Sequence, residues 1–93
     1  MVKHIVLFKM KDKNDIPRAI NALNGMKGKI KGLIDLEVGI DFLMSERSYD
    51  IGLICTLKNK AALIYYQDHE IHRPVKELMA MLRESSVAVD YEY

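Results

Sequence analysis

The order of two hydrophobic periodicities constrains the fold of this chain more than any other feature of its sequence. Apolar residues occupy every second position, as they do in β-strands, in four segments: residues 2–10, 33–42, 49–57 and 87–91. Two other segments, residues 15–28 and 59–82, have apolar residues three and four positions apart, which is typical of amphipathic helices. The order strand, helix, strand, strand, helix, strand predicts an α+β, ferredoxin-like βαββαβ fold, in which the helices cover one face of a four-stranded antiparallel sheet.

The fully apolar side of each strand is expected to face the helices. His4 lies on this side of the first strand, together with Val6 and Phe8. In the second strand the same reasoning assigns five residues to the helix-facing side: Ile34, Leu36, Val38, Ile40 and Phe42. Because side chains alternate between the two faces of a strand, the intervening residues are left on the other face.

The last strand is expected to direct Val87, Val89 and Tyr91 toward the helices and Asp90 away from them. The opposite face of the sheet then has an apolar patch inside a rim of carboxylates, formed by Ile5, Leu7, Ile54 and Ala88. Such a patch is typical of a protein interface. Two identical sheets can pack face to face around a twofold axis, so we expect a homodimer. The alternative is a monomer on which these apolar residues are simply exposed.

Length and composition limit the class of protein. The 93 residues are expected to form a single domain, residues 1–93, and the net charge of +1 with scattered lysines argues against a nucleic-acid partner. The continuous apolar run at residues 5–8 is too short for a membrane span, so we expect no membrane partner either. The lone cysteine, Cys55, cannot form an internal disulfide, which fits a cytoplasmic location.

Residues 65–75 hold two of the three histidines and Pro74. Inside a helix, a proline removes a hydrogen bond and clashes with the preceding turn, at a cost of about 3 kcal/mol. The helix is therefore expected to break between Asp68 and Arg73 and to resume at Pro74. His69 and His72 have the spacing of a helical pair of metal ligands, but no clear carboxylate or thiolate partner accompanies them, so we expect no metal and no cofactor.

Three segments carry a resemblance to a known family. Residues 2–9 form an opening strand with an early histidine, His4, and residues 87–91 form a closing strand. Between them, residues 49–72 contain a strand that leads into a tyrosine, a histidine three positions later and a second histidine after three more. Together and in this order, over essentially the whole chain, these segments resemble the stress-responsive dimeric α/β-barrel (Dabb) family.

The resemblance implies a dimer and a site. Members of this family are typically homodimers whose two sheets close into a shared α+β barrel. In some relatives, among them plant polyketide cyclases, a tyrosine and the second histidine perform acid–base chemistry in a pocket between sheet and helices. For this chain, the resemblance implies catalytic roles for Tyr66 and His72, with His4 and His69 nearby as ligand-binding residues.

One position departs from the pattern of the family. A proline usually follows the first histidine directly, whereas this chain has Glu70 there and its proline at Pro74. The bend is therefore expected to be displaced by about one helical turn. This displacement would change the direction in which the His72 side chain points relative to the pocket.

Two functions are open from the sequence. In the first, a small, largely apolar ligand binds between sheet and helices, and cofactor-free chemistry of the cyclase or isomerase type follows. His72 then takes and returns a proton, and Tyr66 donates a hydrogen bond to an enolate oxygen. In the second, the protein is non-catalytic and stress-responsive or structural: Tyr66 and His4 are core residues, and His72 is bonded to backbone at a helix start. The position of these side chains relative to a cavity distinguishes the two.

Overall fold

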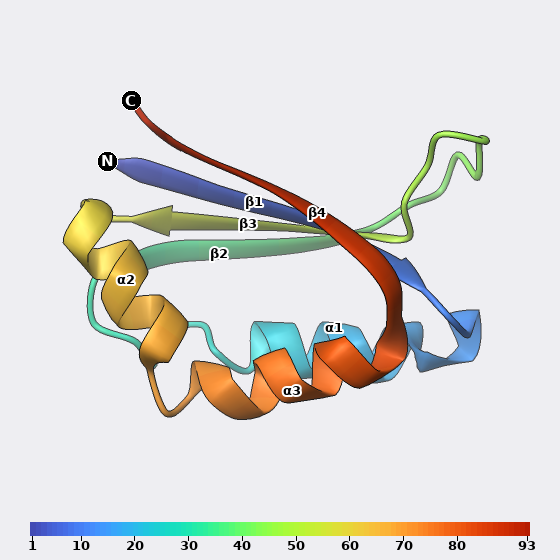
Figure 1. The fold of residues 1–93 in the computed structure, drawn as a ribbon, viewed down its shortest axis with the longest axis horizontal. Helices are drawn as coiled ribbons and strands as arrows, with labels where there is room; N and C mark the ends of the chain where they lie inside the picture. Colours follow the sequence, from blue (N-terminus) through green and yellow to red (C-terminus); the bar gives the residue numbers. More distant parts are fainter.

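Four strands form one antiparallel sheet in the computed structural model, which describes residues 1–93 (Figure 1). The strands are β1 (Val2–Met10), β2 (Leu33–Ile40), β3 (Ile51–Leu57) and β4 (Arg83–Glu92). Their order across the sheet is β2-β3-β1-β4, so β1 lies between β3 and β4, and β4 is an edge strand. The predicted ferredoxin-like fold is confirmed.

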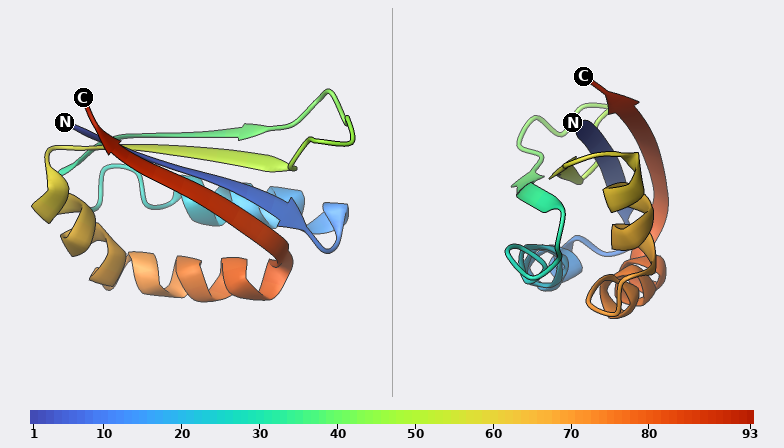
Figure 2. Two further views of the ribbon diagram at one scale, coloured as in Figure 1. Left: turned by 45° about the horizontal axis from the view of Figure 1, so that its top comes forward. Right: turned by 90° about the vertical axis from the view of Figure 1, so that its left-hand side faces the viewer.

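Three helices cover one face of the sheet: α1 (Ile16–Asn24), α2 (Lys60–Asp68) and α3 (His72–Leu82). A short 3-10 helix, Lys13–Asp15, precedes α1. In Figure 2, α1 and α3 lie side by side beneath the sheet, and α2 descends from the end of β3 to the start of α3. None of these helices has the length and hydrophobicity needed to span a lipid bilayer.

The first helix is shorter than the sequence predicts. It ends at Asn24, and residues 25–32 form a series of turns instead of continuing to Gly28. Within these turns, Gly28 and Gly32 have positive φ values of 76° and 85°, a conformation that favours glycine. The turns carry the chain from the far end of α1 back to the start of β2.

The break between α2 and α3 lies where the sequence predicts it. Asn59 caps α2 by accepting a hydrogen bond from the Ala62 backbone N–H at 2.8 Å. Residues 69–71 then separate the two helices. The helix α3 begins at His72, two residues before the predicted start at Pro74. This is possible because the backbone nitrogens of a first helical turn have no partner within the helix, so Pro74 loses no hydrogen bond there.

The apolar sides of the sheet and the helices enclose the core. Leu53 and Leu57 of β3 pack with Leu23 of α1 and Met79 of α3, and all four are at most 3% exposed. Burial of each such side chain contributes about 1.5–3 kcal/mol. His4 lies among them, on the helix-facing side of β1 as predicted.

The prediction for the two faces of β4 is wrong. The ladder between β1 and β4 places His4 opposite Asp90, and directly paired residues share a face of the sheet. Asp90 therefore faces the helices. Val87, Val89 and Tyr91 face away from them and are 45–52% exposed. The side chains of β4 alternate as predicted, but the apolar side of this strand lies on the outer face of the sheet, which is itself apolar.

The face of the sheet that carries no helix has an apolar surface, the outer sheet patch, formed by Ile5, Leu7, Ile54, Val87 and Val89. It differs from the predicted patch at β4, where Ala88 pairs with Val6 and so lies on the helix side. Figure 1 shows that no segment of the chain covers this side of the sheet.

The predicted face of β2 is only partly correct. Its ladder with β3 contains one extra residue, Ile34, which forms a bulge. Leu33 and Leu36, on either side of the bulge, are buried, whereas Ile34 is 56% exposed. The last residue of the strand, Ile40, is also exposed, and Phe42 lies beyond the strand and is 91% exposed.

Replacing Gly32 with alanine is expected to lower the free energy of unfolding by about 1–3 kcal/mol, because the added Cβ meets a neighbour as well as a strained φ. A Cβ at Gly32 would lie 2.8 Å from the Ala62 Cβ on α2. Gly28→Ala is the matched control, since its φ is similar but no atom lies within 4 Å of the added Cβ. Urea unfolding followed by circular dichroism measures both variants. Equal losses would contradict a specific contact between this turn and α2.

Candidate functional site

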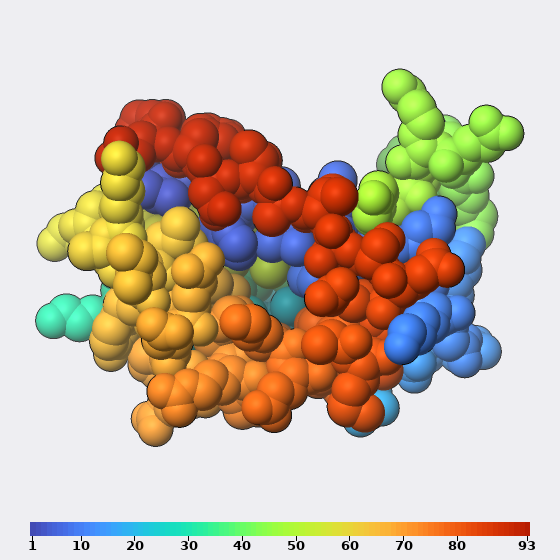
Figure 3. All heavy atoms as spheres, viewed as in Figure 1, coloured from blue at the N-terminus to red at the C-terminus, as the bar shows by residue number.

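A cavity of about 420 Å³ lies between the sheet and the helices. It opens between β4, α2 and α3, where Figure 3 shows a hollow with atoms of β1 at its floor. Its apolar walls include Val6, Phe8, Leu23 and Met79. An apolar cavity that also contains a few polar groups is typical of a small-molecule site. The outer face of the sheet has a depression of about 450 Å³ as well, but none of the four predicted site residues lines it.

Tyr66 and His72 meet in the wall of the inner cavity. Tyr66 is near the end of α2 and His72 is the first residue of α3, so the break at residues 69–71 turns the chain and brings them together. The two ring centroids are 4.4 Å apart, with an angle of 32° between the ring planes. The His69 carbonyl accepts hydrogen bonds from the backbone N–H groups of His72 and Arg73 at 2.9 and 3.0 Å, which closes the turn.

The His72 imidazole is prepared to act as a base. Its Nδ1 lies 3.0 Å from the Gln67 carbonyl oxygen, which can only accept, so Nδ1 carries the hydrogen and Nε2 keeps a free lone pair. Burial is the main cause that lowers the His72 pKa from 6.5, and nearby cationic groups, Lys76 first, lower it further. The Gln67 hydrogen bond opposes these effects in part. The ring is therefore neutral at pH 7.

The Tyr66 hydroxyl is kept protonated by its surroundings. The residue is 1% exposed, and burial, followed by the neighbouring Cys55, raises the Tyr66 pKa far above its ordinary value. Burial also raises the pKa of the Cys55 thiol, to about 11. Cys55 Sγ donates to Tyr66 Oη at 3.7 Å, which leaves the phenol hydrogen free to donate to a ligand oxygen.

His4 reaches the same cavity from the sheet. Its Nδ1 donates to an Asp90 carboxylate oxygen across the β1–β4 ladder, and its ring meets the Tyr66 ring edge-on at 5.8 Å. The sequence prediction missed Asp90, because it placed this residue on the outer face. The signal that could have identified it is the pairing register, since a histidine and an aspartate directly opposite each other on neighbouring strands share a face.

His69 does not line the cavity. Its Nδ1 accepts a hydrogen bond from the Ile71 backbone N–H at 3.0 Å, and its ring packs edge-on against Tyr65 at 5.2 Å. The structure thus brings together three of the four predicted site residues, Tyr66, His72 and His4, and places His69 in the turn behind them. No three His, Cys, Asp or Glu side chains lie in an arrangement that could hold a metal ion.

Five further polar residues line the cavity: Gln67, Asp68, Lys76, Arg83 and Ser86. Sequence reasoning missed them because it followed only histidines and tyrosines. Lys76 could have been found from its spacing, since it lies one helical turn after His72 and on the same side of α3. Arg83 could not have been found from its spacing, because a bulge in β4 determines the face of the sheet on which it lies.

Comparisons with known proteins agree with the fold. A dimeric ferredoxin-like protein of unknown function from Thermobifida fusca is 26% identical, with a TM-score of 0.88 over 99% of this chain and 90% of that one. A protein of the same description from Bacteroides fragilis is 29% identical, with a TM-score of 0.82 over 99% and 95%. The hydroxynitrile lyase from Passiflora edulis has a TM-score of 0.84 over 97% of this chain and 90% of that one, but at 14% identity the likeness is one of fold alone.

No functionally curated protein matches the sequence significantly. The family model described as the Stress responsive A/B Barrel Domain, Dabb, matches residues 2–93. Because this match covers nearly the whole chain, as does the likeness of fold, the protein belongs to the Dabb family.

Proposed function

We propose that this protein binds a small, largely apolar ligand in the inner cavity and performs cofactor-free acid–base chemistry on it. The observation that carries the proposal is the meeting of Tyr66 and His72, with ring centroids 4.4 Å apart, in the wall of a cavity of about 420 Å³. Burial keeps both groups neutral, so at neutral pH Tyr66 offers a hydrogen-bond donor and His72 offers a base.

The chemistry is proton transfer next to a carbonyl group. His72 Nε2 takes a proton from the carbon beside the carbonyl, while the Tyr66 hydroxyl donates to the oxygen on which negative charge develops. The protonated His72 then returns the proton to another carbon, which isomerises the ligand. Alternatively, the enolate carbon bonds to a second carbonyl carbon of the ligand, which closes a ring, and His72 gives the proton to the oxygen of that carbonyl. His4, held by Asp90, fixes the ring of Tyr66, and His69 shapes the turn that presents His72.

The fold is compatible with catalysis. The hydroxynitrile lyase from Passiflora edulis shares it, so a sheet and helices of this arrangement can carry an enzyme active site. At 14% identity, this support extends to the scaffold and not to the reaction or its residues.

We also propose a homodimer that forms through the outer sheet patch. The similar proteins from Thermobifida fusca and Bacteroides fragilis are described as dimeric. Val87, Val89 and Tyr91 are half exposed beside Ile5 and offer a continuous apolar surface that a second copy can bury. A cytoplasmic location belongs to the same proposal, since the buried Cys55 thiol is free.

A non-catalytic role is the second candidate, and one observation favours it. Tyr66 is almost fully buried and is in contact with Cys55, as expected of a tyrosine that stabilises the core. In that case Tyr66 and His72 would join α2 to α3, and the cavity would have no substrate.

His72 is expected to titrate with a pKa below 6.5, as the Nδ1–H tautomer, because burial disfavours its charged form. The neutral base should then persist from pH 7 to below pH 6.5, and proton abstraction should decline only as the pH falls through the lowered pKa. Two-dimensional NMR of the imidazole nitrogens measures both properties. A midpoint at or above 6.5, or a hydrogen on Nε2, would remove His72 from the proposed role.

His72→Gln and Tyr66→Phe are each expected to reduce catalysed proton exchange by about 100-fold, the usual contribution of a positioned base or oxyanion donor. The assay follows deuterium uptake beside the carbonyl of 2-octanone in D₂O by NMR. Tyr65→Phe is the matched control, since Tyr65 is half exposed and does not line the cavity. If the wild-type protein gives no acceleration while Tyr66→Phe lowers stability, the non-catalytic candidate replaces the catalytic one.

Ile5→Asp is expected to convert the dimer to a monomer, because it places a charge in the centre of the outer sheet patch. Ile64→Asp is the control, since Ile64 is 63% exposed on α2 and lies outside this face. Sedimentation velocity at micromolar concentration distinguishes the two states. A wild-type monomer, or an equal effect of both substitutions, would show that the proposed interface is wrong.

A further inference from the structure

A bulge at the start of β4 decides which charge faces the inner cavity. The ladder between β1 and β4 pairs Ser85 with Lys9 and then Arg83 with Met10, so Glu84 has no partner of its own. Met10 is 6% exposed on the helix-facing side, and Arg83 shares that side because it is paired with Met10. In a regular ladder Glu84 would be the residue opposite Met10. The bulge therefore presents a cation to the cavity where simple alternation would present a carboxylate.

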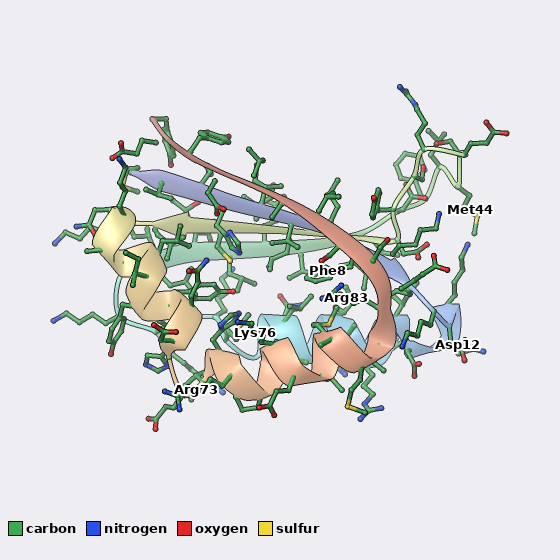
Figure 4. All side chains as sticks on the ribbon, viewed as in Figure 1. Phe8, Asp12, Met44, Arg73, Lys76 and Arg83 are labelled. Atoms are coloured by element: carbon green, nitrogen blue, oxygen red, sulfur yellow. The ribbon has the colours of Figure 1, made fainter.

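A second cation reaches the cavity from α3. Lys76 lies one turn after His72 and lines the cavity with it. Figure 4 shows the Lys76 and Arg83 side chains between α3 and the sheet, whereas Arg73 extends from the opposite side of the helix. Two long basic side chains on one wall, two helical turns apart, can converge on one small anionic group.

Neither cation is neutralised within the protein. The four ion pairs of the structure involve His4, Lys13, Lys27 and Lys60, but not Lys76 or Arg83. One carboxylate, Asp68, lines the cavity, but it is exposed at the end of α2, at the other end of α3 from Arg83. A second carboxylate, Asp90, is bonded to His4. Positive charge at the Arg83 end of the cavity is therefore unmatched.

The surroundings of Arg83 suit an anion with an apolar body. The Ser86 hydroxyl lies in the same wall and can donate a further hydrogen bond, and Arg83 itself is only partly exposed. A guanidinium group binds a carboxylate through two parallel hydrogen bonds, which are stronger where water is partly excluded. Val6, Phe8 and Met79 line the space between this end and the Tyr66–His72 pair.

We infer that the ligand of the inner cavity is an amphiphilic anion, whose carboxylate-like group is bound by Arg83, Lys76 and Ser86 and whose apolar chain extends toward Tyr66 and His72. The inference rests on the proposed function, that the cavity binds a small, largely apolar ligand, and it names the substrate class. The 11-residue α3 separates His72 from Arg83. With a rise of about 1.5 Å per residue and a long arginine side chain, the anionic group and the reacting carbon are on the order of 10 Å apart. A chain of medium length spans that distance.

The test compares octanoate with octanamide, which have the same chain but differ in charge. Chemical shifts of cavity methyl groups, followed by NMR at pH 7.5, give both dissociation constants. The wild-type protein is expected to bind octanoate about tenfold more tightly than octanamide. The double variant Lys76→Gln, Arg83→Gln should bring the two affinities within about twofold, mainly by weakening octanoate binding, and its methyl spectrum shows that the variant is folded. Arg83→Lys should retain part of the preference.

Arg18→Gln is the matched control, since Arg18 is exposed on α1, forms no ion pair and does not line the cavity, and it should leave the preference at its wild-type value. Equal binding of both probes by the wild-type protein would overturn the anion site while leaving ligand binding in the cavity intact. A preference for octanoate that survives in the double variant would overturn the assignment to Arg83 and Lys76. If neither probe shifts the cavity methyl groups, the proposed function fails and the anion site fails with it.

Discussion

The pairing of His4 with Asp90 across β1 and β4 is the constraint on which the rest of the structure depends. This register places Asp90 on the helix side and Val89 on the outer side. A slip by one residue would exchange the two faces along the whole of β4. The cavity would then lose the carboxylate that holds His4, and the outer sheet patch would lose its valines. A single register therefore specifies both surfaces that the proposed function uses.

Burial gives the site its chemistry by acting in opposite directions on two groups. It lowers the pKa of His72 and raises that of Tyr66, because the imidazolium and the phenolate are the charged forms that a poorly hydrated wall disfavours. The result is a neutral base beside a neutral donor, which is the combination that enolisation of a carbonyl compound requires. The core that stabilises the domain and the wall that tunes the site share Tyr66, so stability and reactivity are not separate properties of this residue.

Hydrophobic periodicity was sufficient to predict the order of the elements, the fold class and the helix-facing side of His4, because these depend on patterns within one segment. The resemblance to the Dabb family, and not the periodicity, implied that Tyr66 and His72 belong together, and their rings do lie side by side. The faces of β4 and the roles of Asp90 and Arg83 were out of reach, because they depend on how two distant strands pair. Reading the apolar side of a strand as its core side fails where the other face of the sheet is apolar too.

The edge strand β4 links the two surfaces physically. It pairs only with β1, and it contributes Arg83 and Ser86 to the inner cavity while Val87 and Val89 face outward. An edge strand held by one neighbour is more easily displaced than a central one, and only 18 of 93 residues are buried in the single chain. Burial of the outer sheet patch in the proposed dimer would fix β4 in place from its other side. Association would thereby hold the cavity residues of β4 in position.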